Sequence, residues 1–272
     1  MLKFHQLFSK KCSIIGMVHV EALPGTPLFK NNLEALITKA KKETELYMQY
    51  DLDGILIENM HDVPYIQARH FGPEITATMT RICTEIKTII PNNLPCGIQI
   101  LSCGNKEALA VAKACSLHFI RAESYVFGHI GDEGFTDANA GLLLRYRKEI
   151  SAENVLVFSD IKKKHSSHAI TADISLEETA KAAEYFLTDG VILTGTSTGI
   201  PAEVNELQAL RKTTTLPILI GSGVTVDNVQ DYVMADALII GSHFKKNGTW
   251  SNEVDEERVK IFMEKIGKNN FY

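Results

Sequence analysis

The chain has 272 residues, the size of one α/β barrel domain or of two smaller domains. Its 45% hydrophobic and 22% charged residues are ordinary for a globular protein and exclude wholesale disorder. Lysine and arginine number 28 against 33 aspartates and glutamates, and the net charge of −5 gives no general electrostatic reason to bind nucleic acid or anionic membranes.

Residues 1–12 precede the first predicted strand, and we expect a flexible extension there. They lack the apolar stretch of a secretory signal, so we expect a cytoplasmic protein. Lysines occur with no acidic residue before Glu21, which leaves a mitochondrial presequence as the alternative. No apolar run approaches the roughly 20 residues that a membrane-spanning helix needs.

Short apolar runs rich in β-branched residues recur from residue 13 onward. They are too short for helices and too uniformly apolar for half-exposed strands, so each run predicts a strand buried on both faces. In chain order the eight runs are Ser13–Val18, Asp53–Ile57, Cys96–Leu101, His118–Ala122, Val155–Ser159, Val191–Thr194, Pro217–Ile220 and Ala237–Ile240.

Stretches with helical periodicity separate these runs, and Leu33, Leu36, Ile37 and Ala40 share one face of the first. Eight alternations of strand and helix without a linker predict a single (β/α)8 barrel domain over residues 1–272. An open doubly wound sheet is the alternative. Such a sheet usually carries a glycine-rich turn after its first strand, where this chain has His19–Glu21.

The carboxyl ends of the barrel strands carry the polar side chains. Active sites of such barrels lie at this end, and residues two apart on a strand face the same side. This rule predicts a mouth lined by His19, Glu58, Gln99, Arg121, Glu123, Asp160, Lys162, Thr194 and Thr196. The alternative is that some of these residues cap strands or form structural ion pairs, such as Arg121 with Glu58.

Glycine-rich turns follow the last three predicted strands. Glycine lets backbone N–H groups approach a ligand closely, and barrels commonly hold phosphate on the loops after strands seven and eight. The predicted phosphate-binding residues are Thr194, Gly195, Gly221, Ser222, Gly223, Gly241 and Ser242. Plain tight turns, which also need glycine, are the alternative.

A charged run leaves the fifth strand from Asp160 to His165. Asp160 and Lys162 on one face can form an acid–base couple, or the lysine pKa can fall far enough for Schiff-base chemistry. His165 adds a group that titrates near neutrality. Two further lysines disfavour an imine, so acid–base or electrostatic catalysis is the favoured interpretation.

His19, Glu58, Glu123, Asp160 and His165 could hold a divalent metal. No short-spaced ligand pair such as HxxxH supports a metal site, so we expect neither metal nor cofactor. The cysteines are odd in number and show no CxxC pair, which predicts reduced thiols. Two of them flank the third strand without a neighbouring base and are expected to be core or loop thiols.

A set of short segments, spread in order along the chain, indicates a resemblance to a protein family. The segments are Gly16–His19, Leu23–Pro27, Glu58-Asn59, Asp62–Tyr65, Phe119–Arg121, Leu143–Arg147, Asp160–His165, Thr194-Gly195, Thr198-Gly199, Gly221–Val224, Asn228, Val254-Asp255 and Arg258-Val259. Together they resemble the BtpA/SgcQ family of (β/α)8-barrel proteins. Two places depart from the family pattern, namely Gln99–Gly104 and Glu123. Both fall at the predicted mouth, which implies a different substrate choice.

The resemblance implies the barrel and its mouth, and it leaves two kinds of function open. One branch of the family is a factor for photosystem I accumulation, and another belongs to a sugar-metabolism setting. An enzyme and a biogenesis factor are therefore both compatible with the resemblance.

We expect an enzyme that acts on a small phosphorylated metabolite by isomerase- or lyase-type chemistry, since no dinucleotide fingerprint is present. Asp160 and Glu58 are the predicted acid–base pair, with Lys162 stabilising developing negative charge and His19 and Arg121 orienting the substrate. Asn59, Gln99 and His165 are additional predicted site residues.

Two alternatives stay open. One is a non-catalytic assembly factor, for which an exposed apolar surface would matter more than the mouth. The other is a Schiff-base lyase that uses Lys162. For partners, we expect a phosphorylated small molecule, with no nucleic acid and no membrane span, and the sequence is compatible with a homo-oligomer.

Overall fold

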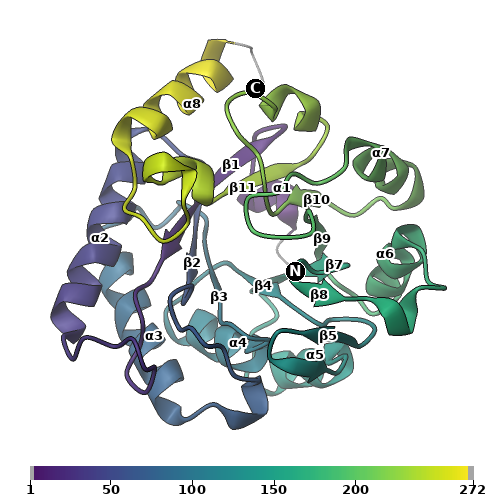
Figure 1. Ribbon diagram of the computed structural model, residues 1–272, viewed down its shortest axis with the longest axis horizontal. Coiled ribbons are helices and arrows are strands. Elements are labelled where there is room, and N and C mark those ends of the chain that lie inside the picture. The colour runs from purple at the N-terminus through teal and green to yellow at the C-terminus, as the bar shows by residue number, and fades with distance from the viewer. Residues whose placement is uncertain (1–2, 269–272) are drawn as a thin grey trace.

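The computed structural model describes residues 3–268. Eight parallel strands close into a barrel in the spatial order β1-β11-β10-β9-β7-β4-β3-β2, with helices around it (Figure 1). The strands are β1 (Ser13–His19), β2 (Gly54–Glu58), β3 (Cys96–Gln99), β4 (Phe119–Ala122), β7 (Leu156–Ile161), β9 (Gly190–Leu193), β10 (Ile218–Ile220) and β11 (Ala237–Ile240). The predicted (β/α)8 barrel is confirmed, because every predicted run overlaps one of these strands.

The outer ring consists of helices whose apolar faces pack on the strands (Figure 1). They are α2 (Leu33–Gln49), α3 (Pro73–Lys87), α4 (Asn105–Ala114), α5 (Ala140–Glu149), α6 (Leu176–Tyr185), α7 (Val204–Thr213) and α8 (Glu256–Lys268). Between β10 and β11 the connection is only a short 3-10 helix, Val229–Tyr232. Within residues 3–268, no helix combines the length and apolar character needed to cross a bilayer.

Local sequence signals set where these helices begin. The Asn32 side chain accepts a hydrogen bond from the Ala35 N–H at the start of α2. Ser175 and Glu178 form a capping box at the start of α6. Such caps satisfy N–H groups that have no partner inside the helix, and they fix the point at which each loop ends.

The barrel interior is filled by a second apolar cluster, separate from the one under the helices. It includes Ile15 and Met17 of β1, Leu56 of β2, and the rings of Phe119 and Phe158, whose centroids lie 5.3 Å apart. The two strands β1 and β2 are in register here, since Met17 pairs with Leu56. The interior of the barrel is therefore a packed apolar core, and the polar side chains lie at the carboxyl ends of the strands.

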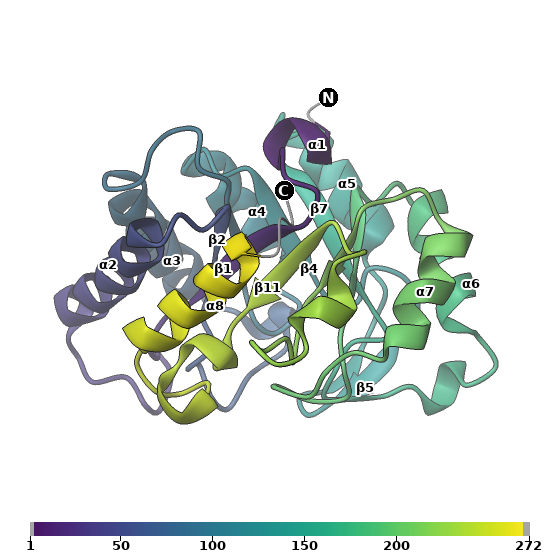
Figure 2. The same cartoon turned by 90° about the horizontal axis from the view of Figure 1, so that it is seen from above.

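Residues 3–12 differ from the flexible extension expected for residues 1–12, whose first two positions lie outside the described residues. They contain helix α1 (Phe4–Leu7), which covers the amino-terminal end of the barrel (Figure 2). The side chains of Phe4 and Phe8 are 3% and 2% exposed and join the interior cluster. Burying two aromatic rings holds this segment on the barrel.

A small antiparallel sheet, absent from the sequence prediction, lies at the opposite end of the molecule from α1 (Figure 2). It consists of β5 (His129–Gly131), β6 (Gly134–Thr136) and β8 (Ser166–Ser167). The hairpin of β5 and β6 is an insertion between β4 and α5, and its turn carries Asp132 and Glu133. This sheet therefore adds two carboxyl groups to the mouth of the barrel.

Candidate functional site

Two adjoining cavities occupy the mouth, and they share Glu58, Met60, Lys164 and Thr198. The first, the basic lobe, lies over the ends of β1, β10 and β11 and has a cavity volume of about 110 Å³. The second, the acidic lobe, lies over the ends of β2, β3 and β4 and has a cavity volume of about 200 Å³. Two adjoining cavities of this size suit a small metabolite.

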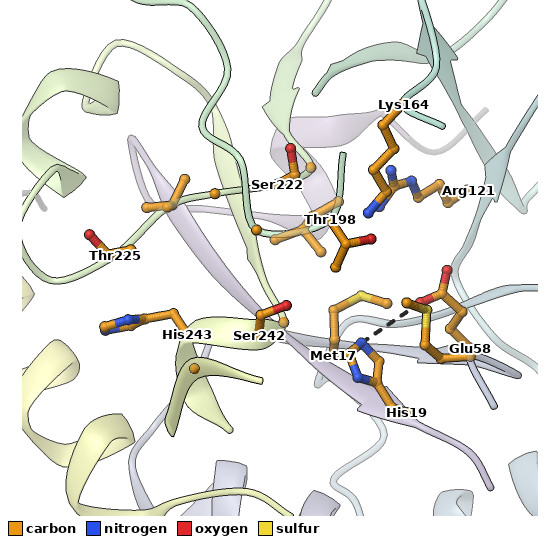
Figure 3. Close-up of a pocket in the computed structure, with 18 of the residues that line it drawn as sticks. Met17, His19, Glu58, Arg121, Lys164, Thr198, Ser222, Thr225, Ser242 and His243 are labelled. Carbon is orange, nitrogen blue, oxygen red and sulfur yellow. Dashed lines mark ion pairs between the residues drawn. The ribbon is translucent and has the colours of Figure 1, made fainter. Parts of the chain in front are cut away.

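Cationic groups dominate the basic lobe (Figure 3). Arg121, Lys164 and the α8 residue Arg258 line it, with Glu58 as its single carboxyl group among the lining residues. The glycine turns after β10 and β11 form the opposite wall, together with the hydroxyl groups of Thr225 and Ser242. Positive side chains, hydroxyl groups and close backbone are the features that bind a phosphate.

Arg258 was missed by the sequence analysis as a site residue, although its segment contributed to the family resemblance. Its Nε donates to the backbone oxygen of His243 at 2.6 Å, and its Nη2 lies 3.1 Å from His243 Nδ1. These contacts fix the guanidinium group at the edge of the lobe. The sequence around Arg258 does not indicate a site residue, because α8 reaches the mouth only when the eight strands close into the barrel.

The predicted glycine residues separate into two groups. Gly221, Gly223 and Gly241 line the basic lobe, whereas Gly195 does not. A Cβ on Gly195 would lie 2.4 Å from the backbone oxygen of Ile200, so this glycine is required for close packing of its own loop. Gly195 is therefore placed outside the lobe by the structure.

The turn after β10 packs tightly on the loop after β9. Gly223 has φ +72°, and a Cβ there would lie 2.2 Å from Pro201 N. The Ser222 hydroxyl accepts a hydrogen bond from Gly195 N–H at 2.8 Å and donates to the backbone oxygen of Ile200 at 3.0 Å. The hydroxyl group of Ser222 thus ties two loops together, while the residue itself still lines the lobe.

His19 and Glu58 end two neighbouring strands and face each other, with Nε2 and Oε2 3.8 Å apart (Figure 3). His19 Nδ1 lies 3.0 Å from the backbone oxygen of Trp250, which can only accept a hydrogen bond. Burial lowers the pKa of His19 well below its ordinary value, so the ring is neutral and Nδ1 carries its proton. The Nε2 lone pair therefore faces Glu58 and the basic lobe.

The pKa of the Glu58 carboxyl group is shifted upward, whereas that of His19 is shifted downward. Burial raises its pKa above the ordinary value, while Arg121 and Lys164 oppose the shift. Glu58 consequently holds a proton to a higher pH than an exposed glutamate does. A neutral imidazole and a carboxyl group of raised pKa therefore lie side by side in the cavity, and such pairs are candidates for acid–base catalysis.

Asp160 lines neither lobe and belongs to the lining of a third, smaller cavity. Arg121 Nε donates to both carboxylate oxygens, at 3.2 and 3.1 Å, and Arg121 Nη2 lies 3.0 Å from Oδ1. The side chains are 4% and 1% exposed. The structure therefore places Asp160 as the residue that positions Arg121, and the partner of Arg121 is Asp160 rather than the Glu58 considered from sequence.

Lys162 lines neither lobe, and with Asp160 it lines the third, smaller cavity. The strand ends at Ile161, and Lys162 has φ +50°, so the alternation of faces stops there. Its ammonium group donates to the backbone oxygens of Thr171 and Ile174 at 3.2 and 2.7 Å, outside both lobes. Lys164 occupies the mouth instead, and burial together with Arg121 lowers its pKa.

The remaining predicted residues have different placements. Asn59 bridges two loops, donating to Asp62 Oδ2 at 2.9 Å and accepting from Leu101 N–H at 2.7 Å. Thr194 is buried outside both lobes, and its hydroxyl group has no hydrogen-bond partner in the described residues. His165 lines the exposed rim of the acidic lobe. Of these three, only His165 can contact a ligand in the mouth.

The acidic lobe contains a hydrogen-bonded network. Gln99 Nε2 donates to Glu123 Oε1 at 3.2 Å, and Glu123 Oε2 accepts from the Cys103 N–H at 2.8 Å. Lys163 Nζ lies 3.6 Å from Glu123 and 3.8 Å from Glu133. Burial alone would raise the pKa of Glu123, but Lys163 and the Cys103 N–H lower it below the ordinary value. Glu123 is therefore a fixed anion.

Both departures from the family pattern, Gln99 and Glu123, meet in this network.

For the predicted metal alternative, residues 3–268 contain no group of three His, Cys, Asp or Glu side chains arranged to hold an ion. Burial raises the pKa of Cys96 and of Cys103 to about 12, so both are thiols and not thiolates.

Buried neutral histidines make a testable contribution to stability. Burial lowers the pKa of His61, His129 and His243 to about 4. Histidines of the unfolded chain titrate near 6.5, so the unfolded state binds more protons below that pH and the free energy of unfolding falls. We expect the urea midpoint to be constant above about pH 7 and to fall between about pH 6.5 and 4.

A His129→Gln variant should show a shallower fall than the parent chain, because it removes one such proton difference. The matched control is His5→Gln on α1, where the side chain is exposed. An identical acid profile for His129→Gln and the parent chain would contradict the assignment of a neutral buried imidazole.

These features define a class, namely a (β/α)8 barrel with a basic cavity and a buried histidine–glutamate pair at the carboxyl ends of its strands. The sequence model of the BtpA family matches residues 10–268. The chain belongs to the BtpA family.

Relatives of similar length support this membership. An uncharacterized mitochondrial protein of Caenorhabditis elegans is 43% identical over 263 residues, which cover 96% of this chain and 95% of that protein. The photosystem I biogenesis protein BtpA of Synechocystis is 31% identical over 265 residues, covering 97% and 91%.

Solved structures agree in fold. Phosphoribosyl anthranilate isomerase of Thermus thermophilus is 10% identical with a TM-score of 0.59, covering 95% of this chain and 100% of that one. The N-acetylmannosamine-6-phosphate 2-epimerase of Clostridium perfringens is 14% identical with a TM-score of 0.54, covering 89% and 92%. At such low identity, these likenesses show a shared barrel and no more.

Proposed function

We propose that this chain is an enzyme that acts on a small phosphorylated metabolite through isomerase- or lyase-type proton transfer. The observation that carries the proposal is the coincidence, in one cavity, of three cationic side chains with a neutral imidazole and a carboxyl group of raised pKa. Burying such groups costs stability unless a ligand uses them. Two structurally similar barrels also have names that include phosphorylated compounds.

The phosphate is proposed to lie against the turns at Gly221–Gly223 and Gly241-Ser242, close to Arg258. Here the backbone can approach an anion closely, because glycine carries no side chain. Arg258 supplies the guanidinium N–H groups that do not face His243, and such groups suit phosphate oxygens. The reacting carbons would then extend toward His19 and Glu58 on the other side of the lobe.

The proposed proton transfer uses side chains only. His19 Nε2 removes a proton from a carbon next to a carbonyl group of the substrate, and the resulting negative charge develops on the carbonyl oxygen. Arg121 and Lys164 stabilise this oxygen, and Glu58 donates a proton to it or to the neighbouring carbon. The reverse transfers restore both groups, so the cycle needs no external oxidant or reductant.

A ligand screen tests the proposal directly. We expect one or more sugar phosphates to raise the thermal unfolding temperature, because a ligand that binds only the folded state stabilises it. The same sugars without phosphate should have a much smaller effect. Equal shifts for both, or no shift with any phosphorylated compound, would contradict the proposal.

An Arg258→Gln variant is expected to bind the identified sugar phosphate about tenfold more weakly, since it loses a charge-assisted hydrogen bond. Isothermal titration calorimetry measures the change. Lys260→Gln is the matched control, because Lys260 lies on the same helix with a side chain that is 47% exposed and forms an ion pair with Glu257. Equal weakening in the two variants would indicate general screening of charge and not a phosphate contact.

A non-catalytic assembly role is the second candidate, and the name of the Synechocystis relative favours it. A cell line that lacks this protein distinguishes the two by complementation. Rescue by a folded His19→Gln variant supports assembly, and failure of that variant to rescue supports catalysis. The third candidate, a Schiff-base lyase that uses Lys162, is less favoured, since the Lys162 ammonium group donates to two backbone oxygens and lines neither lobe.

For location, the mitochondrial relative supports the mitochondrial alternative over the cytoplasmic expectation. We therefore propose import into mitochondria. Microscopy of the chain with a carboxyl-terminal fluorescent tag tests this, and diffuse fluorescence throughout the cytoplasm would contradict it.

A further inference from the structure

The acidic lobe is lined by Gln99, a buried side chain whose amide oxygen is unpaired among the described residues. Gln99 is 2% exposed, and its Nε2 is directed at Glu123 by a hydrogen bond of 3.2 Å. Its Oε1 has no hydrogen-bond partner in the described residues. An unpaired buried amide oxygen is costly, and a ligand N–H or O–H donor would satisfy it.

The charge of this lobe is opposite to that of the basic lobe. Glu123, Asp132 and Glu133 line it together with the Glu58 carboxyl group shared with the basic lobe, and the Lys163 ammonium lies between Glu123 and Glu133. A second anionic group of a ligand would be repelled here. The lobe is instead suited to a neutral or cationic group that donates hydrogen bonds.

The outer walls of the lobe are apolar and aromatic. Trp250 and Tyr65 line it together with Leu101. The Trp250 ring packs against His61 with 5.0 Å between centroids, and the Tyr65 hydroxyl donates to the backbone oxygen of Met60 at 2.6 Å. Both rings are held in place, and such walls favour a flat ring over an open polyol chain.

From these features we infer that the acidic lobe binds a nitrogen-containing ring. The substrate class is then a sugar phosphate that carries such a ring, with the phosphate in the basic lobe and an N–H group donated to Gln99 Oε1. This inference rests on the proposed function for the position of the phosphate. The four residues shared by the lobes would surround the sugar that joins the two ends.

Trp250 provides the readout, because it is the single tryptophan of the chain. The full chain is titrated with inorganic phosphate, ribose 5-phosphate, the four common nucleoside 5′-monophosphates and the free nucleosides. Affinity is measured by calorimetry and occupation of the acidic lobe by quenching of tryptophan fluorescence. We expect at least one nucleotide to bind about tenfold more tightly than ribose 5-phosphate and to quench Trp250.

A Gln99→Met variant should lose most of this tenfold advantage, while its affinity for ribose 5-phosphate stays within about twofold of the parent chain. Ser13→Ala is the matched control. It also removes an unpaired buried oxygen, but at the start of β1, far from the mouth. Both affinities should be unchanged in that variant.

The binding measurements distinguish a wrong ring inference from a wrong proposed function. If ribose 5-phosphate binds and no nucleotide binds more tightly, the ring inference is overturned and the phosphate proposal stands. A tenfold advantage that survives in Gln99→Met overturns the assignment to this lobe. If no phosphate compound binds but a nucleoside quenches Trp250 in a Gln99-dependent manner, the proposed function fails and the ring inference stands.

Discussion

A His19→Gln variant is expected to lose at least about a hundredfold of the rate at which a bound sugar phosphate exchanges a carbon-bound hydrogen with deuterium from D₂O. Glutamine keeps a polar side chain of similar size at this position but cannot take up a proton at neutral pH. The neutral imidazole, fixed by its contact with Trp250, is the base of the proposed reaction. Proton nuclear magnetic resonance measures the exchange without knowledge of the full reaction.

The pH dependence gives an independent check. Because the pKa of His19 is lowered, the base stays active below pH 6.5 and the rate should fall only in more acidic solution. Because the pKa of Glu58 is raised, the donor stays protonated above its ordinary range, and the rate should fall again as it loses its proton. Glu58→Gln should remove this second fall.

The matched control for this experiment is His5→Gln on α1, at the opposite end of the barrel. Its exchange rate should equal that of the parent chain, and the His19→Gln variant should retain its affinity for the sugar phosphate within a few-fold. Since the proposed steps use side chains only, exchange should also survive treatment with EDTA. Full exchange by a folded His19→Gln variant would remove the proposed base.

An Arg121→Met variant is expected to lose about 3–5 kcal/mol of unfolding free energy, because it leaves the Asp160 carboxylate buried without its partner. The pair is almost fully enclosed, and three nitrogen–oxygen contacts between 3.0 and 3.2 Å join its members. Urea denaturation measures the loss. The same change at the exposed Arg145 should stay within about 0.5 kcal/mol of the parent chain.

The double variant Arg121→Met/Asp160→Leu separates charge from packing. It removes both buried charges together, so it should recover most of the stability that Arg121→Met loses. A double variant as unstable as the sum of the two single variants would show that side-chain packing, and not the unpaired carboxylate, causes the loss.

The barrel was predictable because its strands are buried on both faces and leave apolar runs at regular spacing. Met17 and Leu56 illustrate this, since each lies in a predicted run and both pack inside the barrel. Two parts escaped prediction. Helix α1 has only four residues, and the β5–β6 hairpin consists of short strands in a polar insertion. Such elements depend on the barrel for their order and leave no periodic pattern.

The site was predictable where strand geometry holds and unpredictable where it ends. His19, Glu58 and Arg121 lie in strands, so the rule of alternating faces placed them at the mouth. Lys162 lies one residue beyond its strand with a positive φ, and the rule therefore selected Lys162 where the structure has Lys164. Hydrogen-bond partners, such as the Asp160 that fixes Arg121, depend on inter-strand distances that a sequence does not contain.

The aromatic plug formed by Phe4 and Phe8 has a kinetic consequence for the proposed enzyme. Because packed rings fill the amino-terminal end of the barrel, a reaction product has to leave through the same opening by which the substrate entered. The release of product and the binding of a new substrate molecule would then exclude each other. In steady-state measurements the product should accordingly behave as a competitive inhibitor, raising the apparent Michaelis constant while leaving the maximal velocity unaltered.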